Sequence, residues 1–301
     1  MPDFFVSMNP LVSLDENLPN LAPLDDPVVV TLIRSARGVV MPRAASEGRY
    51  RRVAALARDW FPNFEPRFAY AGKTKQTMLF HRYEVRHPKT FIYRSPADLG
   101  AADRSGLPLA YPFVLKGDRG GGGSSVHPVT CRDNLQAALG RLPGEEPLLI
   151  QEWVQHGGMD LRVVVVGFQM VSYFRVGRGF YNNVCRGGRV ERSLFPERQE
   201  AGMDAVAKFC SLTGIQVAGF DLMFPDEGPP VFVEINFHFG RKGLGGTPGF
   251  RRLFGEAVRA WQRGVSYPPH SQSGGELPIS LRKNPMSQPS FCTGLPPDSP
   301  L

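Results

Sequence analysis

Two acidic residues near the end of the chain lie inside otherwise apolar runs, where an uncompensated charge is costly. Asp221 is in GFDLMF, Glu234 is in PVFVEIN, and Asn236 ends that second run. The runs are predicted to pair as a hairpin centred between Glu227 and Gly228, which places Asp221 opposite Glu234. Strand side chains alternate, so Glu234 and Asn236 share one face. These oxygen donors suit Mg²⁺ with phosphate, and we predict a metal site; an exposed acidic hairpin face is the alternative.

A lysine followed by a run of glycines offers phosphate chemistry. VLK, which ends at Lys116, precedes GDRGGGGSS (117–125). In such a hairpin the loop amides can approach a triphosphate closely because glycine has no Cβ, and Lys116 can pair with it. The order excludes a P-loop and a kinase glycine loop, since the lysine stands on the wrong side, and Ser125 breaks a dinucleotide fingerprint. A flexible hairpin tip is the alternative.

Hydrophobic periodicity and turn residues predict the elements that position these residues. Strands are expected at 27–33, 38–41, 113–116, 124–129, 148–154, 161–167, 219–224 and 230–236. Helices are expected at 49–61, 74–83, 130–142 (with a capping box of Thr130 and Asp133), 196–212 (with Pro196 at its start and Gly214 as its C-cap) and 250–263. Residues 1–26 are expected to be irregular, and the Pro-, Ser- and Gly-rich stretch 267–301 to be a disordered tail.

Composition narrows the class of protein. The chain has 301 residues, 42% of them hydrophobic and 21% charged, which is ordinary for a globular protein. Its net charge of +7 suits anionic ligands, but no aromatic–basic nucleic-acid motif is present. No signal peptide or membrane span is evident, so a cytoplasmic protein is expected. Four widely spaced cysteines argue against a disulfide framework or a zinc site: Cys131, Cys185, Cys210 and Cys292.

An ordered set of motifs over residues 73–240 resembles the ATP-grasp superfamily of carboxylate–amine ligases, most closely its RimK-like branch. The motifs are Lys73, FVLKGDRGGGGSSV, LLIQEWV, GMDLRVVVVG, FYNNVCRGG, GFDLMF and VFVEIN. The resemblance implies an α+β (α/β) ATP-grasp fold, in which two α+β subdomains grip ATP after a small α/β N-terminal domain. It divides the chain into that domain (1–72), an ATP-grasp domain (73–266, with subdomains 73–150 and 151–266) and the tail.

The resemblance also implies a role for each site residue. Lys73 and Lys116 would contact the ATP phosphates, and Arg162 and Asn183 would lie near the γ-phosphate and the acceptor. Asp160 would bind ribose, while Asp221, Glu234 and Asn236 would hold Mg²⁺ or Mn²⁺. The phosphate flap would include Gly120, Gly121, Gly122, Gly123 and Ser124, and the adenine hinge Gln151, Glu152, Trp153 and Val154.

Several of these assignments have a structural alternative. Lys73 could be a solvated surface charge, Arg162 could pair with Asp160 across the strand, and Asn183 could serve a turn. His238 is expected in the core. Further candidates for holding a carboxylate or the acyl phosphate are Arg175, Arg178, Arg186, Arg241 and Lys242.

The implied function is ATP-dependent formation of an amide from a small-molecule or peptide carboxylate and an amine, through an acyl phosphate. The alternative is a non-catalytic ATP-binding regulator or scaffold. The segment after Asn236, FHFGRKGLGG, departs from the small-residue and proline run of the family. Such segments help to build the acceptor pocket in relatives, so the resemblance does not carry over the identity of the substrates.

Overall fold

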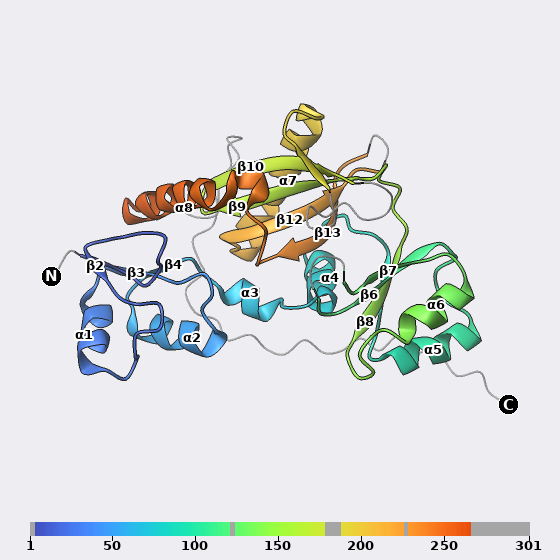
Figure 1. Cartoon of the computed structure of the whole chain (residues 1–301), viewed down its shortest axis with the longest axis horizontal. Coiled ribbons are helices and arrows are strands. Elements are labelled where there is room, and N and C mark those ends of the chain that lie inside the picture. Colours follow the sequence, from blue (N-terminus) through green and yellow to red (C-terminus); the bar gives the residue numbers. More distant parts are fainter. Residues whose placement is uncertain (1–3, 121–123, 178–187, 226–227, 266–301) are drawn as a thin grey trace. The chain divides into compact units, whose positions relative to one another are not determined.

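The structure, a computed structural model, describes residues 4–120, 124–177, 188–225 and 228–265 (Figure 1). These residues form three sheets with helices around them. The combination agrees with the predicted α+β class. Several predictions lie outside the described residues: the tail, Asn183, the glycines at 121–123, and the candidate arginines Arg178 and Arg186.

Sheet A, near the N-terminus, is parallel, with the strand order β2-β1-β3-β4. Its strands are β1 (Phe5–Ser7), β2 (Glu16–Asn17), β3 (Gly38–Val40) and β4 (Trp60–Phe61). The strand predicted at 38–41 is therefore confirmed, whereas residues 1–26 contain two short strands that the sequence analysis did not predict. Strands this short give no visible alternation, and they are defined by the pairing of β1 with β3 on one side and with β2 on the other.

The predicted strand PVVVTLI is instead a helix, α1 (Pro27–Ser35). Asp26 accepts a hydrogen bond from the Val28 backbone N–H at 2.7 Å, and proline occupies the first turn, where its missing N–H costs nothing. Val29 and Ile33, four residues apart, are the buried residues of α1, whereas Val28 is exposed. The cap and this helical spacing outweigh the β-propensity of the valines.

The helix predicted at 49–61 is also corrected at both ends. It is α2 (Glu47–Leu56), and the hydroxyl of Ser46 accepts a hydrogen bond from the Arg49 backbone N–H. The apolar pair at its predicted end forms β4 beside β3, with Phe61 fully buried. Parallel pairing with a distant strand cannot be read from local periodicity.

Sheet B holds the glycine loop and is antiparallel, with the order β5-β8-β6-β7. Its strands are β5 (Thr90–Tyr93), β6 (Phe113–Gly117), β7 (Val126–Val129) and β8 (Leu148–Glu152). Helices α5 (Pro96–Ser105) and α6 (Arg132–Leu139) accompany it, and residues of both contribute to its core.

The predicted capping box at the start of α6 is wrong. The N-cap residue is Cys131, which makes no side-chain capping bond. The hydroxyl of Thr130 instead donates to Asn134 Oδ1 at 2.6 Å. The helix also ends at Leu139 rather than at residue 142, because Gly140 occupies its C-cap.

Sheet C is a five-stranded antiparallel sheet with the order β11-β10-β9-β12-β13. Its strands are β9 (Met159–Val166), β10 (Gln169–Val176), β11 (Arg189–Glu191), β12 (Val217–Met223) and β13 (Val231–Asn236). Two long helices belong to the same part of the chain, α7 (Pro196–Thr213) and α8 (Gly246–Gln262). Shorter helices are α3 (Glu65–Ala69) and the 3₁₀-helix η2 (Lys242–Leu244).

Several sequence predictions for sheet C are confirmed. Pro196 begins α7, and Gly214 ends it in the left-handed conformation at φ 69°. The hairpin of β12 and β13 places Asp221 opposite Glu234, as predicted, but an irregularity after Asp221 shifts the register by one residue nearer the turn, where Leu222 pairs with Phe232. The last helix begins four residues before the predicted Phe250.

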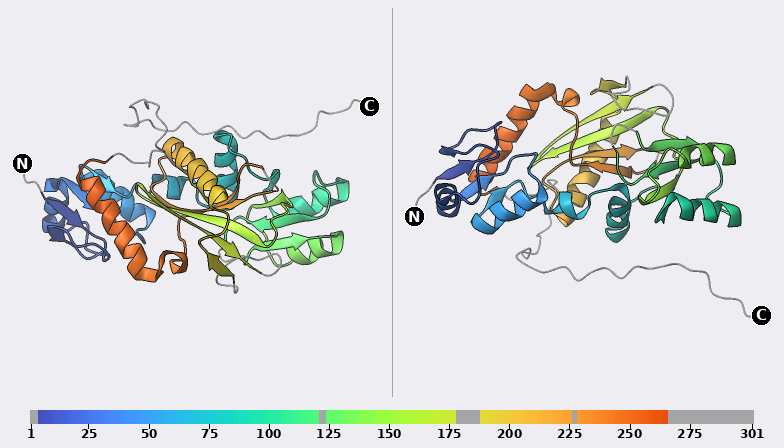
Figure 2. Two further views of the ribbon diagram at one scale, coloured as in Figure 1. Left: turned by 90° about the horizontal axis from the view of Figure 1, so that it is seen from above. Right: turned by 60° about the horizontal axis from the view of Figure 1, so that its bottom comes forward.

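Helices α7 and α8 pack on different faces of sheet C (Figure 2). Phe209 of α7 is in one cluster with Val163, and Phe254 of α8 is in another with Val164. Because strand side chains alternate, Val164 shares its face with Arg162 and Asp160. The α8 face of the sheet is therefore apolar at one end and charged at the other.

Helix α4 (Lys73–Arg82) lies beside the edge strand β13 (Figure 1). The side chain of Gln76 donates to the Ile235 carbonyl and accepts from the Ile235 N–H, both at 2.8 Å. The Phe232 N–H donates to the Arg86 carbonyl at 2.8 Å. These bonds tie the segment before sheet B to the edge of sheet C and hold Lys73 next to Glu234.

Candidate functional site

The first turn of α4 is tied to the start of the glycine loop. Asp118 Oδ1 accepts hydrogen bonds from the Thr74 N–H at 2.8 Å and from its hydroxyl at 2.6 Å. The Lys73 N–H donates to the Asp118 carbonyl at 3.1 Å. Gly72 precedes the helix with φ 91°, a conformation that favours glycine. Asp118 therefore caps a helix distant in sequence and fixes the position of Lys73.

Gly72→Ala is expected to destabilise the protein by on the order of 2 kcal/mol, because it combines a strained φ with a steric clash. The added Cβ would stand 2.3 Å from Asp118 Oδ2. Urea denaturation measures the change. The matched control is Gly48→Ala in α2, where a Cβ meets nothing within 4 Å, and this variant should be neutral or stabilised. A Gly72→Ala protein as stable as the wild type would contradict the prediction.

The side chain of Lys73 reaches both the loop and the hairpin. Its Nζ donates to the Gly120 carbonyl at 3.1 Å and lies 3.9 Å from Glu234 Oε1. The side chain is 9% exposed, so the alternative of a solvated surface lysine is wrong. A cavity of about 240 Å³ opens here, lined by Gly72, Lys73, Gln76, Asp118, Arg119, Gly120 and Glu234.

Lys116 is held by a chain of hydrogen bonds inside sheet B. Its Nζ donates to Gln151 Oε1 at 2.6 Å, Gln151 Nε2 donates to the Thr90 hydroxyl at 3.0 Å, and that hydroxyl donates to the Pro88 carbonyl at 2.7 Å. Burial lowers the pKa of Lys116 to about 8, and the charge of Glu234 opposes this shift. The ammonium group is thus buried and oriented, and it loses its proton at a lower pH than an ordinary lysine.

A row of charged side chains crosses sheet C at directly opposed positions. Arg175 on β10 faces Asp160 on β9, Asp221 on β12 faces Arg162 on β9, and Glu234 on β13 faces Asp221. Arg175 binds Asp160 with its Nε and Nη2 and lies 3.0 Å from Asp221. Arg162 binds Asp221 with both Nε and Nη2, at 2.5 and 3.0 Å. The Arg162–Asp160 pair, which the sequence left open as an alternative, is replaced by these two pairs.

A glycine gives Arg162 the room to reach across β12. A Cβ at Gly219 would lie 3.1 Å from Arg162 Nη1 and 3.1 Å from the Cβ of Phe239. The guanidinium group is therefore packed between β12 and the segment that follows β13.

The pKa values in the row follow from burial and pairing. Burial raises the pKa of Asp160 against the attraction of Arg175. Burial also opposes ionisation of Asp221, but Arg162 and Arg175 outweigh it and hold its pKa below the usual value. For Glu234, burial raises the pKa in spite of Lys73. Glu234 is thus the carboxyl group of the hairpin whose charge is least compensated.

The predicted metal ligands differ in their capacity to accept a cation. Asp221 Oδ1 accepts from Arg162 and lies beside Arg175, while Oδ2 accepts from Arg162 and from Asn236 Nδ2. These four contacts use the acceptor sites of a carboxylate. Glu234 and the amide oxygen of Asn236 therefore fit a divalent ion, whereas Asp221 fits only after losing a contact. In the described ranges, no three His, Cys, Asp or Glu side chains gather as a metal cluster.

The predicted adenine hinge lies at the end of β8. Glu152 is exposed and its N–H donates to the Lys89 carbonyl at 2.9 Å. Trp153 and Val154 follow, both half-buried, and Ser124 of the loop is exposed. His238 is also exposed, so its expected place in the core is wrong.

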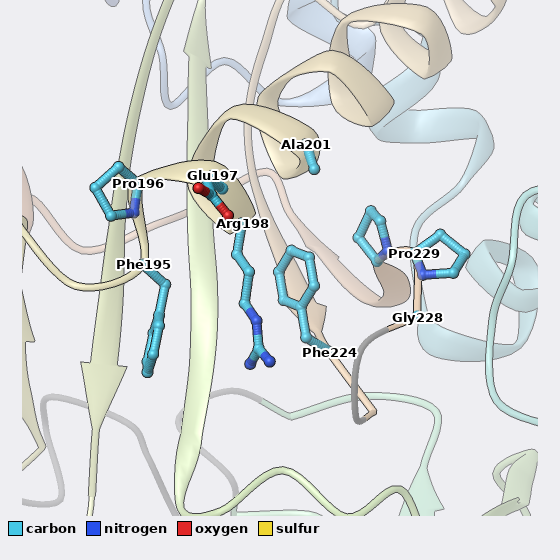
Figure 3. Close-up of a pocket in the computed structure, with 9 residues that line it drawn as sticks. Phe195, Pro196, Glu197, Arg198, Ala201, Phe224, Gly228 and Pro229 are labelled. Carbon is cyan, nitrogen blue, oxygen red and sulfur yellow. The ribbon is translucent and has the colours of Figure 1, made fainter.

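A larger cavity, of about 800 Å³, lies at the start of α7 (Figure 3). There the guanidinium of Arg198 lies 5.0 Å from the ring centre of Phe195 and 5.7 Å from that of Phe224. None of the site residues predicted from the sequence lines it. We therefore place the candidate site at the smaller cavity beside Lys73.

Sequence reasoning missed three contributors to the site. Asp118 was treated only as part of a loop, Gln151 only as hinge backbone, and Arg175 as a candidate for binding substrate. Arg175 is instead buried between two carboxylates. The sequence contained a signal for this role, because Arg175 is a charged residue near the end of an otherwise largely apolar strand, but the partners of Arg175 depend on strand register.

Solved structures show which class of fold this is. A RimK domain ATP-grasp protein from Sphaerobacter thermophilus superposes with a TM-score of 0.55 at 17% identity, covering 73% of this chain and 80% of that one. The VanG D-Ala:D-Ser ligase of Enterococcus faecalis gives 0.57 at 15% identity, covering 76% of this chain and 73% of that one. The fold is ATP-grasp, as the sequence predicted.

The sequence comparisons identify the family within the ATP-grasp fold. The family model for the RimK-like ATP-grasp domain matches residues 71–250, so the chain belongs to that family. Relatives include human N-acetylaspartylglutamate synthase A (31% identity, 52% of this chain) and β-citrylglutamate synthase B of Danio rerio (30%, 51%). A probable α-L-glutamate ligase of Rhodopirellula baltica is 28% identical over 57% of this chain. The chain covers 38–42% of these three relatives' lengths.

A helix must be long and largely apolar to span a bilayer, and this requirement can be applied to the helices in the described ranges. None of them combines the length and the apolarity that a membrane span needs.

Proposed function

We propose that the protein is an ATP-dependent carboxylate–amine ligase. The proposal rests on one observation: Lys73, Lys116 and Glu234 converge from three elements beside the glycine loop, in a chain of the RimK-like ATP-grasp family. Two buried ammonium groups next to backbone amides form an environment for phosphate. The adenine would lie at the backbone of Gln151–Val154, and the ribose would share Asp160 with Arg175.

In this reaction an oxygen of the acid attacks the γ-phosphorus of ATP, and ADP leaves with the bridging oxygen. The amine then attacks the acyl carbon of the acyl phosphate, loses a proton and releases phosphate. Lys73 and Lys116 neutralise charge on the phosphates, and Arg162 holds Asp221 in place. Phosphoryl transfer of this kind depends mainly on positioning and electrostatics, which are what these fixed side chains provide.

Glu234 and Asn236 would hold Mg²⁺ or Mn²⁺, which supplies further charge neutralisation on the phosphates when bound. Asp221 would join these ligands by giving up one of its contacts with Arg162, Arg175 or Asn236. Lys73 lies beside Glu234 and is positioned to share the same phosphate oxygens.

The relatives' names indicate which amine to test first. Citrylglutamate, acetylaspartylglutamate and glutamate ligase share glutamate, so we propose glutamate as the amine of this reaction. The test is phosphate release from ATP with glutamate and a panel of acids, alongside the shift in melting temperature with ADP. If ADP stabilises the protein but no acid–amine pair releases phosphate, the alternative of a non-catalytic ATP-binding protein holds. If no nucleotide stabilises it, both fail.

The lowered pKa of Lys116, about 8, gives a pH dependence. A lysine whose folded pKa is depressed is protonated below that value and neutral above it, and phosphate binds the protonated form. Above the pKa, nucleotide affinity is therefore expected to fall by up to about tenfold per pH unit. ADP titration by calorimetry between pH 7.5 and 9.5 measures it.

Lys116→Arg is the matched variant for this pH dependence, because its guanidinium stays charged over the whole range. Its affinity for ADP should change little with pH. A wild-type profile that is equally flat would contradict the assignment of Lys116 to the phosphates.

A further inference from the structure

Three arginines from distant parts of the chain lie together at the end of sheet A. Arg43 follows β3, Arg67 is in α3, and Arg241 precedes η2. Arg43 donates to the Phe239 carbonyl at 3.0 Å and lies 5.0 Å from the ring centre of Phe250. Arg241 lies 4.8 Å from the same ring, and Arg67 donates to the Arg43 carbonyl at 2.8 Å. We call these three residues the arginine cluster.

The arginine cluster has no counter-charge in the described part of the chain. No ion pair there includes Arg43, Arg67 or Arg241, whose contacts are backbone carbonyls, aromatic rings and the Thr247 hydroxyl. Arg43 Nε is buried without a hydrogen-bond partner. Burial, followed by the charges of Arg241 and Arg67, lowers the pKa of Arg43 to about 10. Buried donors and like charges at close range are costly unless an anion joins them.

Phe239 lies between the arginine cluster and Arg162, one of the charged side chains of sheet C. Phe239 carries the carbonyl that Arg43 binds, and the guanidinium of Arg43 lies 4.4 Å from its ring centre. The Cβ of Phe239 and Nη1 of Arg162 are each 3.1 Å from the position of a Cβ on Gly219. An anion at the cluster would therefore lie next to the end of the site where Arg162 holds Asp221.

We propose that Arg43, Arg67 and Arg241 bind the carboxylates of a polycarboxylate substrate and leave a further carboxyl or amino group to react. The proposal rests on the ligase function for the statement that this ligand is a substrate. A guanidinium group matches a carboxylate with two parallel hydrogen bonds, and three such groups match a ligand with two or more carboxylates. Arg241 stands in FHFGRKGLGG, the segment in which this chain departs from its family.

The test uses the full chain without nucleotide and propane-1,2,3-tricarboxylate as the probe, at constant ionic strength. Calorimetry compares the wild type with Arg67→Ala and Arg241→Ala. The control is Arg86→Ala, because Arg86 also donates to a backbone carbonyl, that of Pro229, and lies outside the cluster. We expect each cluster variant to lose roughly tenfold or more in affinity, as for loss of one charge-assisted contact, and the control to match the wild type.

Acetate, inorganic phosphate and ADP serve as further ligands. Weaker binding of acetate than of the tricarboxylate supports the proposal. Equal tricarboxylate binding by the wild type and both cluster variants, or an equal loss in Arg86→Ala, would overturn it. Phosphate binding that is tighter than tricarboxylate binding and is lost in Arg67→Ala and Arg241→Ala would also overturn it. The ADP shift should persist in Arg67→Ala and Arg241→Ala, which also shows that they are folded. Absence of that shift in the wild type counts against the ligase function, whereas arginine-dependent tricarboxylate binding still supports the cluster.

Discussion

Glu234→Gln is expected to lower turnover by about 100-fold, equivalent to about 2.7 kcal/mol of transition-state stabilisation, while nucleotide affinity falls much less. Glutamine keeps the size and one oxygen donor but removes the negative charge that faces Lys73. Binding of a divalent ion next to Asn236 then weakens, and Lys73 loses the carboxylate that positions it. The proposed hinge and ribose contacts do not involve Glu234, so we expect the nucleotide still to bind. The measurement is phosphate release at saturating ATP, together with ADP titration.

The control for Glu234→Gln is Glu191→Gln. Glu191 lies on β11, at the opposite edge of sheet C, and is also half-buried. It should turn over like the wild type. If Glu234→Gln also does so at saturating ATP, Glu234 does not hold a metal ion, and the assignment of the hairpin to the active site is wrong.

Arg175→Leu is expected to destabilise the protein by on the order of 3–5 kcal/mol, because it leaves the buried Asp160 without its ion-pair partner and removes one of the contacts of Asp221. Arg175 is 5% exposed and contacts both Asp160 and Asp221. In the variant the pKa values of these carboxyl groups should rise, so the loss is smaller at pH 5 than at pH 8. Urea denaturation at both pH values measures the effect.

A double variant separates lost packing from unpaired charge. Arg175→Leu with Asp160→Leu removes both members of the pair and should recover much of the stability. Arg189→Leu, at the exposed first position of β11, is the control for removing an arginine from sheet C and should have little effect. A single Arg175→Leu variant as stable as this control would show that the buried pair does not support the fold.

The sequence alone was sufficient to predict those structural features that depend on a local pattern of residues. Counting outward from one turn placed Asp221 opposite Glu234, although it did not predict the one-residue shift in register between Asp221 and the turn. The bounds of α7 followed from Pro196 and Gly214, whose backbone preferences need no tertiary context. The ATP-grasp fold followed from the order of the motifs rather than from any single one of them.

The sequence alone was insufficient to predict contacts between residues that are far apart in the chain. Arg162 has a carboxylate two residues away at Asp160, yet it binds Asp221 on the neighbouring strand. Which of the two it binds depends on the order of strands in sheet C and on the space above Gly219. The prediction of a strand at 27–33 was wrong for a different reason. The valines of this segment favour a strand, and only the cap at Asp26 and the burial pattern show that it is the helix α1.

The contacts of β13 with the α4 segment also bear on self-association. A free edge strand exposes N–H and carbonyl groups that can pair with another chain and begin aggregation. In β13 the amide side chain of Gln76 occupies both groups of Ile235, and the Arg86 carbonyl occupies the N–H of Phe232. At these positions sheet C offers no template for intermolecular strand addition. The residues that position Lys73 beside Glu234 therefore also protect this edge of sheet C against pairing with a strand of another chain.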